Sequence, residues 1–366
     1  MIAKAVIGLG FGDEGKGMFT DYLCFHTSNP LVIRYNGGHQ AGHTVCPGRY
    51  SNSHVFANFG SGTLRDIPTY WSKFCTVDPI ALMREYDILK KDYDPVIYID
   101  ERCPITTPYE VKQNLYVQNV EHGSCGVGFG ATIKREEEFY HLNFIDLFYP
   151  EVLYEKLSLL EKYYGRFETD VNMLYDACER IIGINNIKPC FGIPKNKEYN
   201  YIFEGAQGLL LDQHHGFFPH VTRSNTGTKN ILELHKYINE IYLITRAYQT
   251  RHGNGFMTNF IFSHNIKNNP DETNKRNYQG DFRISLLDVS LLEYAMKKDE
   301  HIRERNCKLV ITCLDHVEND YRFTYKGEIV QCINEKDFVE KISKCLRIKH
   351  VFLSSDPYPT IEEVLY

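Results

Sequence analysis

Apolar and polar positions alternate along this chain in two different rhythms. Short, β-prone apolar runs are separated by amphipathic stretches whose apolar residues recur at helical spacing. This alternation is typical of an α/β fold with a mostly parallel central sheet flanked by helices. The predicted strands are Ala3–Leu9, Leu31–Tyr35, Val96–Asp100, Tyr201–Glu204, Ile241–Thr245, Lys308–Cys313 and His350–Ser354. The predicted helices are Pro79–Glu85, Glu151–Tyr163, Thr169–Ile182, Lys229–Asn239, Leu286–Lys297 and Glu335–Leu346.

No linker, internal repeat or low-complexity tract divides the chain. Residues 1–366 are therefore expected to form a single domain with inserted loops. Two polar stretches read as such loops, Lys195–Asn200 and the longer Asn265–Gln279.

A glycine-rich loop follows the first predicted strand and reads Gly10-Phe11-Gly12-Asp13-Glu14-Gly15-Lys16-Gly17. The next residues, Met18–Leu23, continue as a helix, so strand, loop and helix N-terminus together predict a P-loop-like phosphate cradle with Lys16 as a mobile positive charge. The spacing nearly fits G-x-x-x-x-G-K-[ST], but Gly17 replaces the hydroxyl residue that ligates Mg²⁺. Asp13 is the candidate substitute for that hydroxyl. The simpler alternative is a glycine-rich turn with solvated charges.

A second glycine-rich stretch, Asn36–Thr44, follows the next strand and contains His39 and His43. The carboxyl ends of strands are where α/β folds build their sites. Histidine can carry a proton near neutral pH, as catalysis at a phosphate requires. The alternative is a polar turn with two surface histidines.

Composition narrows the class of partner. The net charge is -6 and no basic run supplies a nucleic-acid-binding face, so nucleic acid is not expected as a partner. No apolar run approaches the roughly 20 residues that span a membrane. The first four residues lead directly into a strand, which argues against a signal peptide. Eleven cysteines lie singly, which favours reduced thiols in the cytoplasm over a disulfide framework or zinc site.

Several stretches resemble, in the same order, the motifs of the adenylosuccinate synthetase family. In that family the motifs read GDEGKG, GGHNAGHT, FEGAQGxLLD, PYVTSSNT, AYxTRVGxGP, WLD and TKLD. Ordered matches from residue 5 to about 320 are far more specific than a lone GxxxxGK. The matching stretches are Gly12–Gly17, Asn36–Thr44, Phe203–Gly208 with Leu210–Asp212, Pro219–Thr226, Ala247–Arg251 with Gly253 and Gly255, Leu286–Asp288 and Leu314–Asp315.

The resemblance implies a ligase that depends on GTP and Mg²⁺ and works in two steps. The γ-phosphate of GTP passes to the 6-oxygen of inosine monophosphate (IMP), and the amine of L-aspartate then displaces that phosphate. The phosphorylation step is needed because a ring oxygen is a poor leaving group until it is phosphorylated. The family further implies a cytoplasmic homodimer of purine nucleotide biosynthesis, with catalysis by positioning and electrostatics.

By position, Asp13 resembles the base that takes the purine N1 proton, and His43 resembles the acid that protonates the departing β–γ bridge oxygen. Gln207 matches a residue that holds the purine, although it can also be read as the cap of a strand-end turn. The resemblance implies nucleotide binding by Gly12, Asp13, Glu14, Gly15, Lys16, Gly17, Gly42, His43, Thr44 and Asp315, and Mg²⁺ ligation by Asp13 and the Gly42 carbonyl. It implies purine binding by Asp13, Gln40, Ala41, Ser124, Cys125, Gln207 and Thr222, and amino-acid binding by Asn277, Gln279, Gly280 and Arg283.

Departures from the family motifs concern the substrate phosphate. Gln40 replaces an asparagine and extends the amide by one methylene. Ser124 or Cys125 must replace a threonine that contacts the substrate phosphate. Phe139 falls where the family supplies an arginine from the partner subunit, and the candidate replacements are Lys134 and Arg135.

Other departures concern the amino acid and the donor base. The arginine-rich loop TTGRxRR keeps only Arg283, with Lys275, Arg276 and Arg223 as candidate replacements for the carboxylate clamp. Cys313 replaces a lysine beside Asp315, so the guanine site is altered, and Asp315 can alternatively be read as a helix cap.

Three hypotheses follow from these matches and departures. The first is adenylosuccinate synthesis from IMP, aspartate and GTP. The second is a virus-type relative that joins aspartate to dGMP with ATP or dATP as donor. In that branch the loop aspartate is often replaced by a smaller residue that admits the 2-amino group, so Asp13 weighs against it. The third is a non-catalytic nucleotide-binding protein, against which the intact Asp13, Lys16, His43 and Gln207 weigh.

Overall fold

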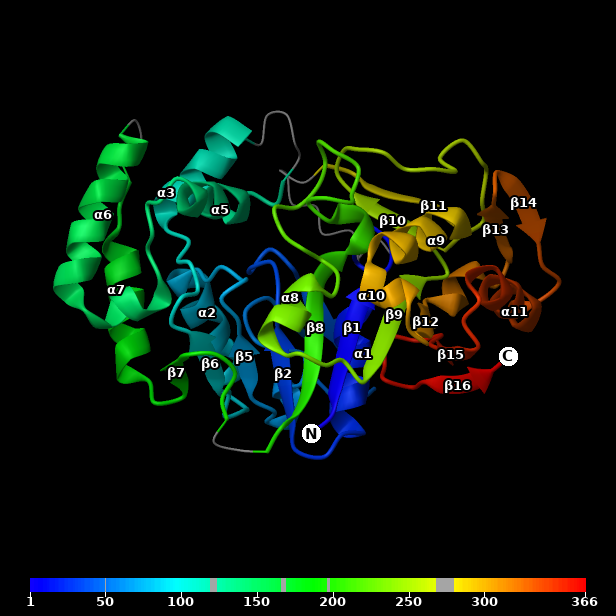
Figure 1. Cartoon of the computed structure of the whole chain (residues 1–366), viewed down its shortest axis with the longest axis horizontal. Helices are drawn as coiled ribbons and strands as arrows, with labels where there is room; N and C mark the ends of the chain where they lie inside the picture. Colours follow the sequence, from blue (N-terminus) through cyan, green and yellow to red (C-terminus); the bar gives the residue numbers. More distant parts are fainter. Residues whose placement is uncertain (50, 119–123, 166–168, 196–197, 268–279) are drawn as a thin grey trace.

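A mostly parallel sheet runs through the molecule. The computed structural model describes residues 1–49, 51–118, 124–165, 169–195, 198–267 and 280–366. Within these ranges, ten strands form the central sheet in the order β16-β15-β12-β9-β1-β8-β2-β5-β6-β7, and only β15 and β16 pair antiparallel (Figure 1). The α/β fold predicted from the sequence is confirmed. The strands are β1 (Ala3–Gly8), β2 (Pro30–Arg34), β5 (Thr69–Trp71), β6 (Ile97–Asp100), β7 (Ile187–Cys190), β8 (Asn200–Gly208), β9 (Glu240–Arg246), β12 (Lys308–Thr312), β15 (His350–Leu353) and β16 (Glu362–Leu365).

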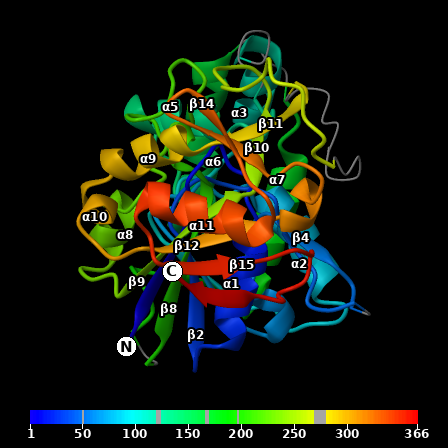
Figure 2. The ribbon, with the colours of Figure 1, turned by 90° about the vertical axis from the view of Figure 1, so that its right-hand side faces the viewer.

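Strand β1 lies near the middle of this sheet, and both of its faces are covered. Ala5 and Ile7 point into one apolar core, whereas Val6 points into the other. This follows from the period of two along a strand, and the continuous apolar run reflects burial on both sides. Helix α1 (Lys16–Phe25) packs on the Val6 face, and α8 (Lys229–Leu234), α9 (Val289–Lys298), α10 (Glu300–Arg303) and α11 (Glu335–Leu346) contribute to the opposite core (Figure 2).

A second, four-stranded sheet lies over the carboxyl-end side of the central sheet (Figure 1). Its order is β10-β11-β13-β14, with β10 (Tyr248–His252), β11 (Phe282–Asp288), β13 (Arg322–Tyr325) and β14 (Glu328–Gln331). The chain passes from β9 into β10 through Ala247 alone, so the end of a central strand and the start of the second sheet are held close together. A small ladder of β3 (His43–Val45) and β4 (His54–Phe56) stands apart.

One predicted helix starts in the wrong place. The sequence predicted a helix from Leu286, but residues up to Asp288 belong to β11, and α9 begins at Val289. The apolar residues Leu286 and Leu287 suit a buried strand as well as a helix face, so the hydrophobic pattern could not separate them. The Asp288 side chain fixes the boundary, because it accepts a hydrogen bond from the Ser290 amide at 2.9 Å as an N-cap.

The other predicted elements agree with the structure to within a few residues, except that Lys229–Asn239 is helical only to Leu234. The stretch Lys195–Asn200 runs into β8 at Asn200, and the predicted loop Asn265–Gln279 falls largely outside the described residues. In the part of the chain that the structure describes, no helix is long and apolar enough to cross a bilayer.

Helices cover the far end of the central sheet beside β7 (Figure 1). They are α2 (Pro79–Leu89), α3 (Pro108–Gln113), α5 (Phe129–Glu137), α6 (Pro150–Tyr164) and α7 (Asn172–Gly183). The apolar faces of α2, α3, α6 and α7 share one core with β6 and β7, which includes Leu82, Leu157 and Ile181. Helix α3 starts with a capping box at Thr107 and Pro108 at its first position, which explains where it begins.

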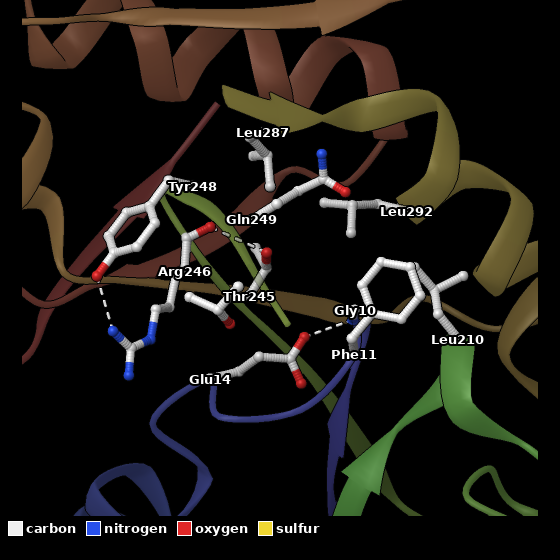
Figure 3. A pocket seen from close by; sticks show the side chains of 11 residues that line it. Gly10, Phe11, Glu14, Leu210, Thr245, Arg246, Tyr248, Gln249, Leu287 and Leu292 are labelled. Carbon is white, nitrogen blue, oxygen red and sulfur yellow. Dashed lines mark hydrogen bonds between the residues drawn. The ribbon is translucent and has the colours of Figure 1, made fainter. Parts of the chain in front are cut away.

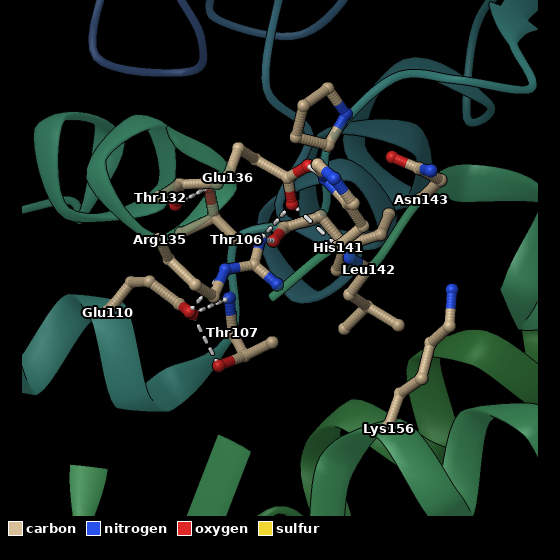
Figure 4. A network of polar contacts seen from close by, with 12 residues as sticks. Thr106, Thr107, Glu110, Thr132, Arg135, Glu136, His141, Leu142, Asn143 and Lys156 are labelled. Atoms are coloured by element: carbon tan, nitrogen blue, oxygen red, sulfur yellow. Dashed lines mark hydrogen bonds and ion pairs between the residues drawn. The ribbon is translucent and has the colours of Figure 1, made fainter. Parts of the chain in front are cut away.

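A buried charge network joins α3 to α5 (Figure 4). The Arg135 side chain has no exposed surface, and its Nε lies 3.1 Å from Glu110 Oε1. Its Nη2 lies 3.0 Å from Glu136 Oε1 and donates to the Ile105 carbonyl at 2.8 Å. Because Arg135 is enclosed by its own subunit, it is not available to contact a substrate phosphate in a partner subunit. That sequence-based candidate role is therefore wrong.

We expect Arg135→Met to lower the free energy of unfolding by about 3–5 kcal/mol, because Glu110 would keep a buried charge without its cation. Lys134→Met, on the same helix, is the matched control. Lys134 is half exposed and only 3.7 Å from Glu138, so its loss should change stability by about 1 kcal/mol or less. Denaturant unfolding of both variants checks this. Equal stabilities would contradict a buried ion pair at Arg135.

Candidate active site

The loops that follow β1, β2, β8 and β9 meet at one edge of the central sheet. The Gly12 carbonyl accepts a hydrogen bond from the Thr250 hydroxyl at 3.2 Å. The Glu14 carbonyl accepts one from the Thr312 hydroxyl at 3.0 Å. Parallel strands bring their carboxyl ends to the same edge of a sheet. These bonds hold the first loop against the carboxyl end of β12 and against the middle of β10 in the second sheet.

The first loop depends on glycine at several positions. Gly12, Asp13 and Gly15 all adopt positive φ angles, of 93°, 58° and 85°. Helix α1 starts directly after Gly15, as the sequence predicted. A β-carbon placed on Gly17 would lie 2.8 Å from the His43 β-carbon. Glycine at position 17 therefore lets the first turn of α1 approach the loop that carries His43. This close approach requires glycine whether or not the loop binds a metal.

The interior of this loop is filled by its own carboxylate (Figure 3). The Gly10 amide donates to Glu14 Oε1, and Lys16 Nζ lies 3.5 Å from Glu14 Oε2. Burial raises the pKa of Glu14. Lys16 is itself buried, so its ammonium is not the mobile charge that the sequence suggested. A phosphate that enters the loop interior must displace the Glu14 carboxylate.

A small cavity borders this loop on the side away from α1 (Figure 3). It measures about 10 Å³, which is room for a single water molecule at most. Phe11, Arg246, Tyr248 and Leu287 are among the residues that line it. It is too small to hold a nucleotide.

Asp13 stands at the mouth of the loop, and 38 % of its side chain is exposed. Arg246 Nη2 lies 3.1 Å from Asp13 Oδ2, and Arg246 Nε donates to the Asp13 carbonyl at 2.5 Å. His252 Nε2 lies 3.7 Å from the same Oδ2. Burial alone would raise the pKa of Asp13, but Arg246, His252 and Lys16 hold it well below its usual range. The carboxylate is therefore ionised and can accept a proton or bind a cation.

His43 is buried, and a carboxylate orients its ring. Its Nδ1 lies 2.6 Å from Oε1 of Glu204, a residue in the middle of β8. Its Nε2 is buried and has no hydrogen-bond partner among the described residues. Burial lowers the pKa of His43, against the opposing effect of Glu204. One ring nitrogen is thus fixed by the carboxylate, while the other is available to a ligand.

Glu204 is fully enclosed and has several partners. The Ser61 amide donates to Oε2 at 3.1 Å, the Ser61 hydroxyl donates to Oε1, and Arg34 Nη1 lies 4.0 Å from Oε2. Burial alone would raise the pKa of Glu204, but His43, Arg34 and Ser61 hold it at about 2. Glu204 therefore stays charged throughout the physiological range and keeps His43 in place.

Amide side chains gather beside the loop. Gln207 Oε1 accepts from Asn36 Nδ2 at 3.3 Å, and the Asn36 Oδ1 accepts from the Ala206 amide at 2.9 Å. Both amide atoms of Gln40 are buried without a hydrogen-bond partner in the described part of the chain. Buried polar groups are normally satisfied, so Gln40 fits a position that a polar ligand completes. Ala41 is buried beside it, whereas Gly42 and Thr44 are exposed.

A second glycine-rich turn precedes α5. Gly126 and Gly128 have φ angles of 72° and 83°, and the Ser124 Oγ accepts from the Asn114 side chain at 2.9 Å. Cys125 is partly exposed in the same turn. Arg223 Nη1 lies 3.0 Å from Glu137 Oε2, which brings the loop that carries Thr222 against α5. This ion pair occupies Arg223, a sequence-based candidate for the carboxylate clamp.

Asp315 lies in a short 3₁₀ helix, Leu314–Val317, and 36 % of its side chain is exposed. Burial raises the pKa of this carboxyl. The Leu314 amide donates to the Ser354 carbonyl at 3.2 Å, so the turn after β15 lies beside Asp315.

The predicted amino-acid site is described only in part. Asn277 and Gln279, and the alternatives Lys275 and Arg276, lie outside the described residues. Gly280 has a φ of 78° and packs against Gly253. Arg283 Nη2 donates to the Gly255 carbonyl at 3.0 Å, and its Nε is buried without a hydrogen-bond partner among the residues described. Part of this guanidinium is thus free to bind a carboxylate.

Residues 5–329 match the sequence model of the adenylosuccinate synthetase family. The chain belongs to the adenylosuccinate synthetase family. The family model covers most of the chain, and the motifs that carry the match supply Asp13, His43 and Gln207.

Two curated relatives agree with this assignment. The adenylosuccinate synthetase of Nitrosomonas europaea is 33 % identical over 277 residues, which cover 68 % of this chain and 63 % of the relative. That of Thermoplasma volcanium is 30 % identical over 328 residues, covering 81 % and 72 %. The chain thus spans about 63 % of the length of the Nitrosomonas relative.

Two solved structures share the fold. The fully ligated adenylosuccinate synthetase of Plasmodium falciparum superposes with a TM-score of 0.76 at 18 % identity, over all of both chains. The succinoaminodeoxyadenylate synthetase of cyanophage S-2L, bound to dGMP and to dATP as an energy donor, superposes with a TM-score of 0.68 at 12 % identity, covering 99 % and 95 %.

Three residues that complete the contacts of the site were not among the predicted site residues. Glu204, which lies within the stretch that resembles FEGAQG, orients His43, while Arg246 and His252 contact Asp13. A signal was present in the sequence, because Glu204 lies within the apolar strand β8 and Arg246 ends the apolar strand β9, where a buried charge is rare unless it is paired. Their partners were not predictable, because Glu204 and His43 are 161 positions apart.

We expect Glu204→Gln to lower the free energy of unfolding at pH 7 by about 3–5 kcal/mol, since a buried ion pair loses one partner. Because the pKa of Glu204 is depressed to about 2, its contribution to stability is complete above the ordinary carboxyl range and is lost as the pH falls toward 2. The difference between wild type and variant should therefore shrink by about 1.4 kcal/mol for each pH unit below 4.5.

Urea unfolding of both proteins between pH 7 and 3.5 measures this difference. Glu233→Gln is the control, because that carboxylate is 52 % exposed and pairs with Lys73 on the surface. Its effect should stay within about 1 kcal/mol at every pH. A Glu204→Gln deficit that is constant down to pH 3.5 would show that the carboxylate is not charged in the folded protein.

Proposed function

We propose that this protein is a ligase that joins L-aspartate to the 6-position of a purine mononucleotide through a 6-phosphoryl intermediate. The motifs favour IMP as the acceptor and GTP as the phosphoryl donor. The observation that carries the proposal is the meeting of Asp13, the Glu204-oriented His43 and the unsatisfied Gln40 amide on loops at one sheet edge. A base, an acid and a polar binding group are the parts that the reaction needs.

In the first step the purine 6-oxygen attacks the γ-phosphorus of the donor. The N1 proton of the base passes to the Asp13 carboxylate, so the electron pair of that N–H bond moves into the ring and onto the oxygen. The contact between Arg246 and Asp13 at 3.1 Å supports this role, because it fixes the orientation of the carboxylate. Arg246 and His252 both contact the same oxygen, Oδ2. Such positioning is the main contribution a protein makes to phosphoryl transfer.

The β–γ bond of the donor breaks in the same step, and negative charge develops on the departing bridge oxygen. A hydrogen bond from His43 Nε2 stabilises that charge, and the proton can pass to the oxygen. This assignment is supported by Nε2 being the ring nitrogen without a partner in the described chain, whereas Nδ1 is held by Glu204. A buried hydrogen bond to developing charge is worth more than the same bond in water.

In the second step the amine of aspartate attacks C6, and the 6-phosphoryl group leaves as inorganic phosphate. The net reaction consumes one β–γ bond and forms one C–N bond. Arg283 is the proposed contact for an aspartate carboxylate, because its Nε is buried and unsatisfied in the described structure. Gln207, Thr222 and the Ser124-Cys125 turn are the proposed contacts for the purine and its 5′-phosphate.

Mg²⁺ fits the residues that the family implies. Asp13 and the Gly42 carbonyl are hard oxygen donors, both residues are solvent-accessible, and Mg²⁺ is commonly held by one or two carboxylates together with substrate phosphates. When bound, the ion supplies neutralisation of the phosphate charge. Gly15, Lys16 and Gly17 are the proposed contacts for the donor phosphates, and Asp315 for its base.

We also propose a cytoplasmic homodimer, as the family resemblance implies. Arg135 is enclosed in its own subunit, and Phe139 is 83 % exposed where relatives carry an arginine. A partner-supplied cation at this position would have to come from Lys134, which is half exposed.

A grid of phosphate-release assays tests the function. We expect turnover with IMP, GTP and aspartate, because the branch that accepts a 2-amino group often carries a smaller residue at the position of Asp13. Parallel wells contain GMP or dGMP as acceptor and ATP or dATP as donor. Turnover with dGMP but not with IMP would favour the cyanophage-type reaction instead, and no release in any well would favour a non-catalytic nucleotide-binding protein.

We expect Asp13→Asn to lower kcat by about 10²–10⁴, because asparagine cannot accept the N1 proton. His43→Asn should lower kcat by a similar factor with the acceptor still bound. Steady-state kinetics and calorimetric binding of the acceptor separate the two effects. Activity of Asp13→Asn within a few-fold of wild type would overturn the base assignment, and loss of binding in His43→Asn would make His43 a binding group.

A further inference from the structure

A series of side-chain contacts leads from Asp13 toward the second sheet. Its first member is Arg246, at the end of β9, which binds both the Oδ2 and the main-chain carbonyl of Asp13. Arg246 is only 6 % exposed. It therefore fixes the backbone and the side chain of Asp13 at the same time, and any movement of its guanidinium must move the carboxylate.

The series of contacts continues into the second sheet. Arg246 Nη1 donates to the Tyr248 hydroxyl at 2.7 Å (Figure 3), and this hydroxyl lies 2.8 Å from His316 Nδ1. The Tyr248 and His316 rings stack with their centroids 5.7 Å apart and an angle of 17° between the planes. His316 Nε2 then lies 3.6 Å from Asp315 Oδ2. Four side-chain contacts thus connect Asp13 with the proposed donor-base contact.

The hydrogen bonds in this chain have one direction. Arginine can only donate, so the Tyr248 oxygen accepts from Arg246. The single hydroxyl proton of Tyr248 is then directed to His316 Nδ1, and a neutral His316 carries its own proton on Nε2, facing Asp315. Hydrogen bonds that are polarised in one direction strengthen one another in a buried environment.

The side chains at the two ends of this series of contacts are more exposed than those in its middle. Asp13 and Asp315 are 38 % and 36 % exposed, so ligands can reach both ends. Tyr248 is only 3 % exposed, and the His316 side chain 13 %, so solvent does not break the middle. An arrangement with two open carboxylates and a buried link suits communication between two ligand sites better than it suits simple packing.

We propose that Arg246, Tyr248 and His316 couple the donor-base contact at Asp315 to the carboxylate of Asp13, so that a bound donor nucleotide orients Asp13 for the purine acceptor. This inference rests on the proposed function. A base that hydrogen-bonds to Asp315 fixes that carboxylate, which fixes His316 and, through Tyr248 and Arg246, the carboxylate of Asp13. By reciprocity, the acceptor strengthens donor binding by the same factor.

Calorimetric binding of the acceptor, with and without a β,γ-imido donor analogue, tests the coupling in the full-length protein. The pairs are IMP with imido-GTP and dGMP with imido-ATP. In wild type we expect the donor analogue to lower the acceptor Kd by at least about fivefold. In Tyr248→Phe, which removes one oxygen and keeps the ring stack, we expect this factor to fall to about one, with each nucleotide alone binding within a few-fold of wild type.

Tyr242→Phe is the matched control. Tyr242 is a buried tyrosine on β9 whose hydroxyl donates to Glu240 at 2.7 Å, near the opposite end of the strand from Arg246. This variant loses the same atom from a buried tyrosine outside the series of contacts and should keep the wild-type coupling factor. A merely structural role for Tyr248 would lower stability in both variants without changing the factor.

His316→Phe provides a second variant in case Tyr248→Phe does not fold, because it keeps a ring against Tyr248 and removes both nitrogens. We expect it to abolish the coupling as well. A coupling factor that is absent in wild type, or unchanged in the folded variants, would overturn this inference while turnover in the substrate grid leaves the proposed function standing. Failure of wild type to bind either nucleotide would overturn both.

Discussion

Glu204 carries its charge in the middle of a central strand where solvent does not reach it, and partners from several surrounding elements satisfy that charge. Ser61 and Arg34 come from two separate parts of the chain, and His43 comes from a third. A buried carboxylate without these partners would take up a proton or destabilise the fold. The carboxylate therefore fixes where the histidine loop packs, and the close approach of that loop to α1 is possible only because residue 17 is glycine.

The phosphate loop that follows β1 also encloses a buried carboxylate, that of Glu14. Relative to an ordinary P-loop it lacks a hydroxyl after the lysine, and it also places the Glu14 carboxylate inside the ring of amides. These two features belong together. Under the proposed function, a loop that already holds an anion and has buried its lysine binds phosphate on its outer side or after Glu14 moves, and Asp13 at the mouth of the loop takes the metal-binding role. Asp13 itself adopts a left-handed backbone conformation.

The sequence was a good guide to the elements with long apolar runs and to the residues on glycine-rich loops. Glycine spacing predicted the strand, loop and helix around Lys16, and glycine-flanked histidines identified His43. It missed β5, since a strand of three residues carries no periodicity, and it assigned Leu286–Asp288 to a helix because a buried strand and a helix face look alike over so short a run. It offered Arg135 as a surface cation, although burial of a charged side chain depends on partners such as Glu110 that only the fold brings together.

Contacts between distant residues also decide how Asp13 must work. Asp13 and Arg246 are 233 positions apart, and no local pattern links them. Arg246 does more than lower the pKa of the Asp13 carboxyl. Its second and third nitrogens bind the Asp13 carbonyl and the Tyr248 hydroxyl, so the same guanidinium holds the loop backbone, the reacting carboxylate and the first strand of the second sheet. The geometry at Asp13 is therefore set jointly by the central sheet and by the sheet that carries the proposed amino-acid contact. Under the proposed coupling, a change at the donor subsite therefore reaches the acceptor through Arg246.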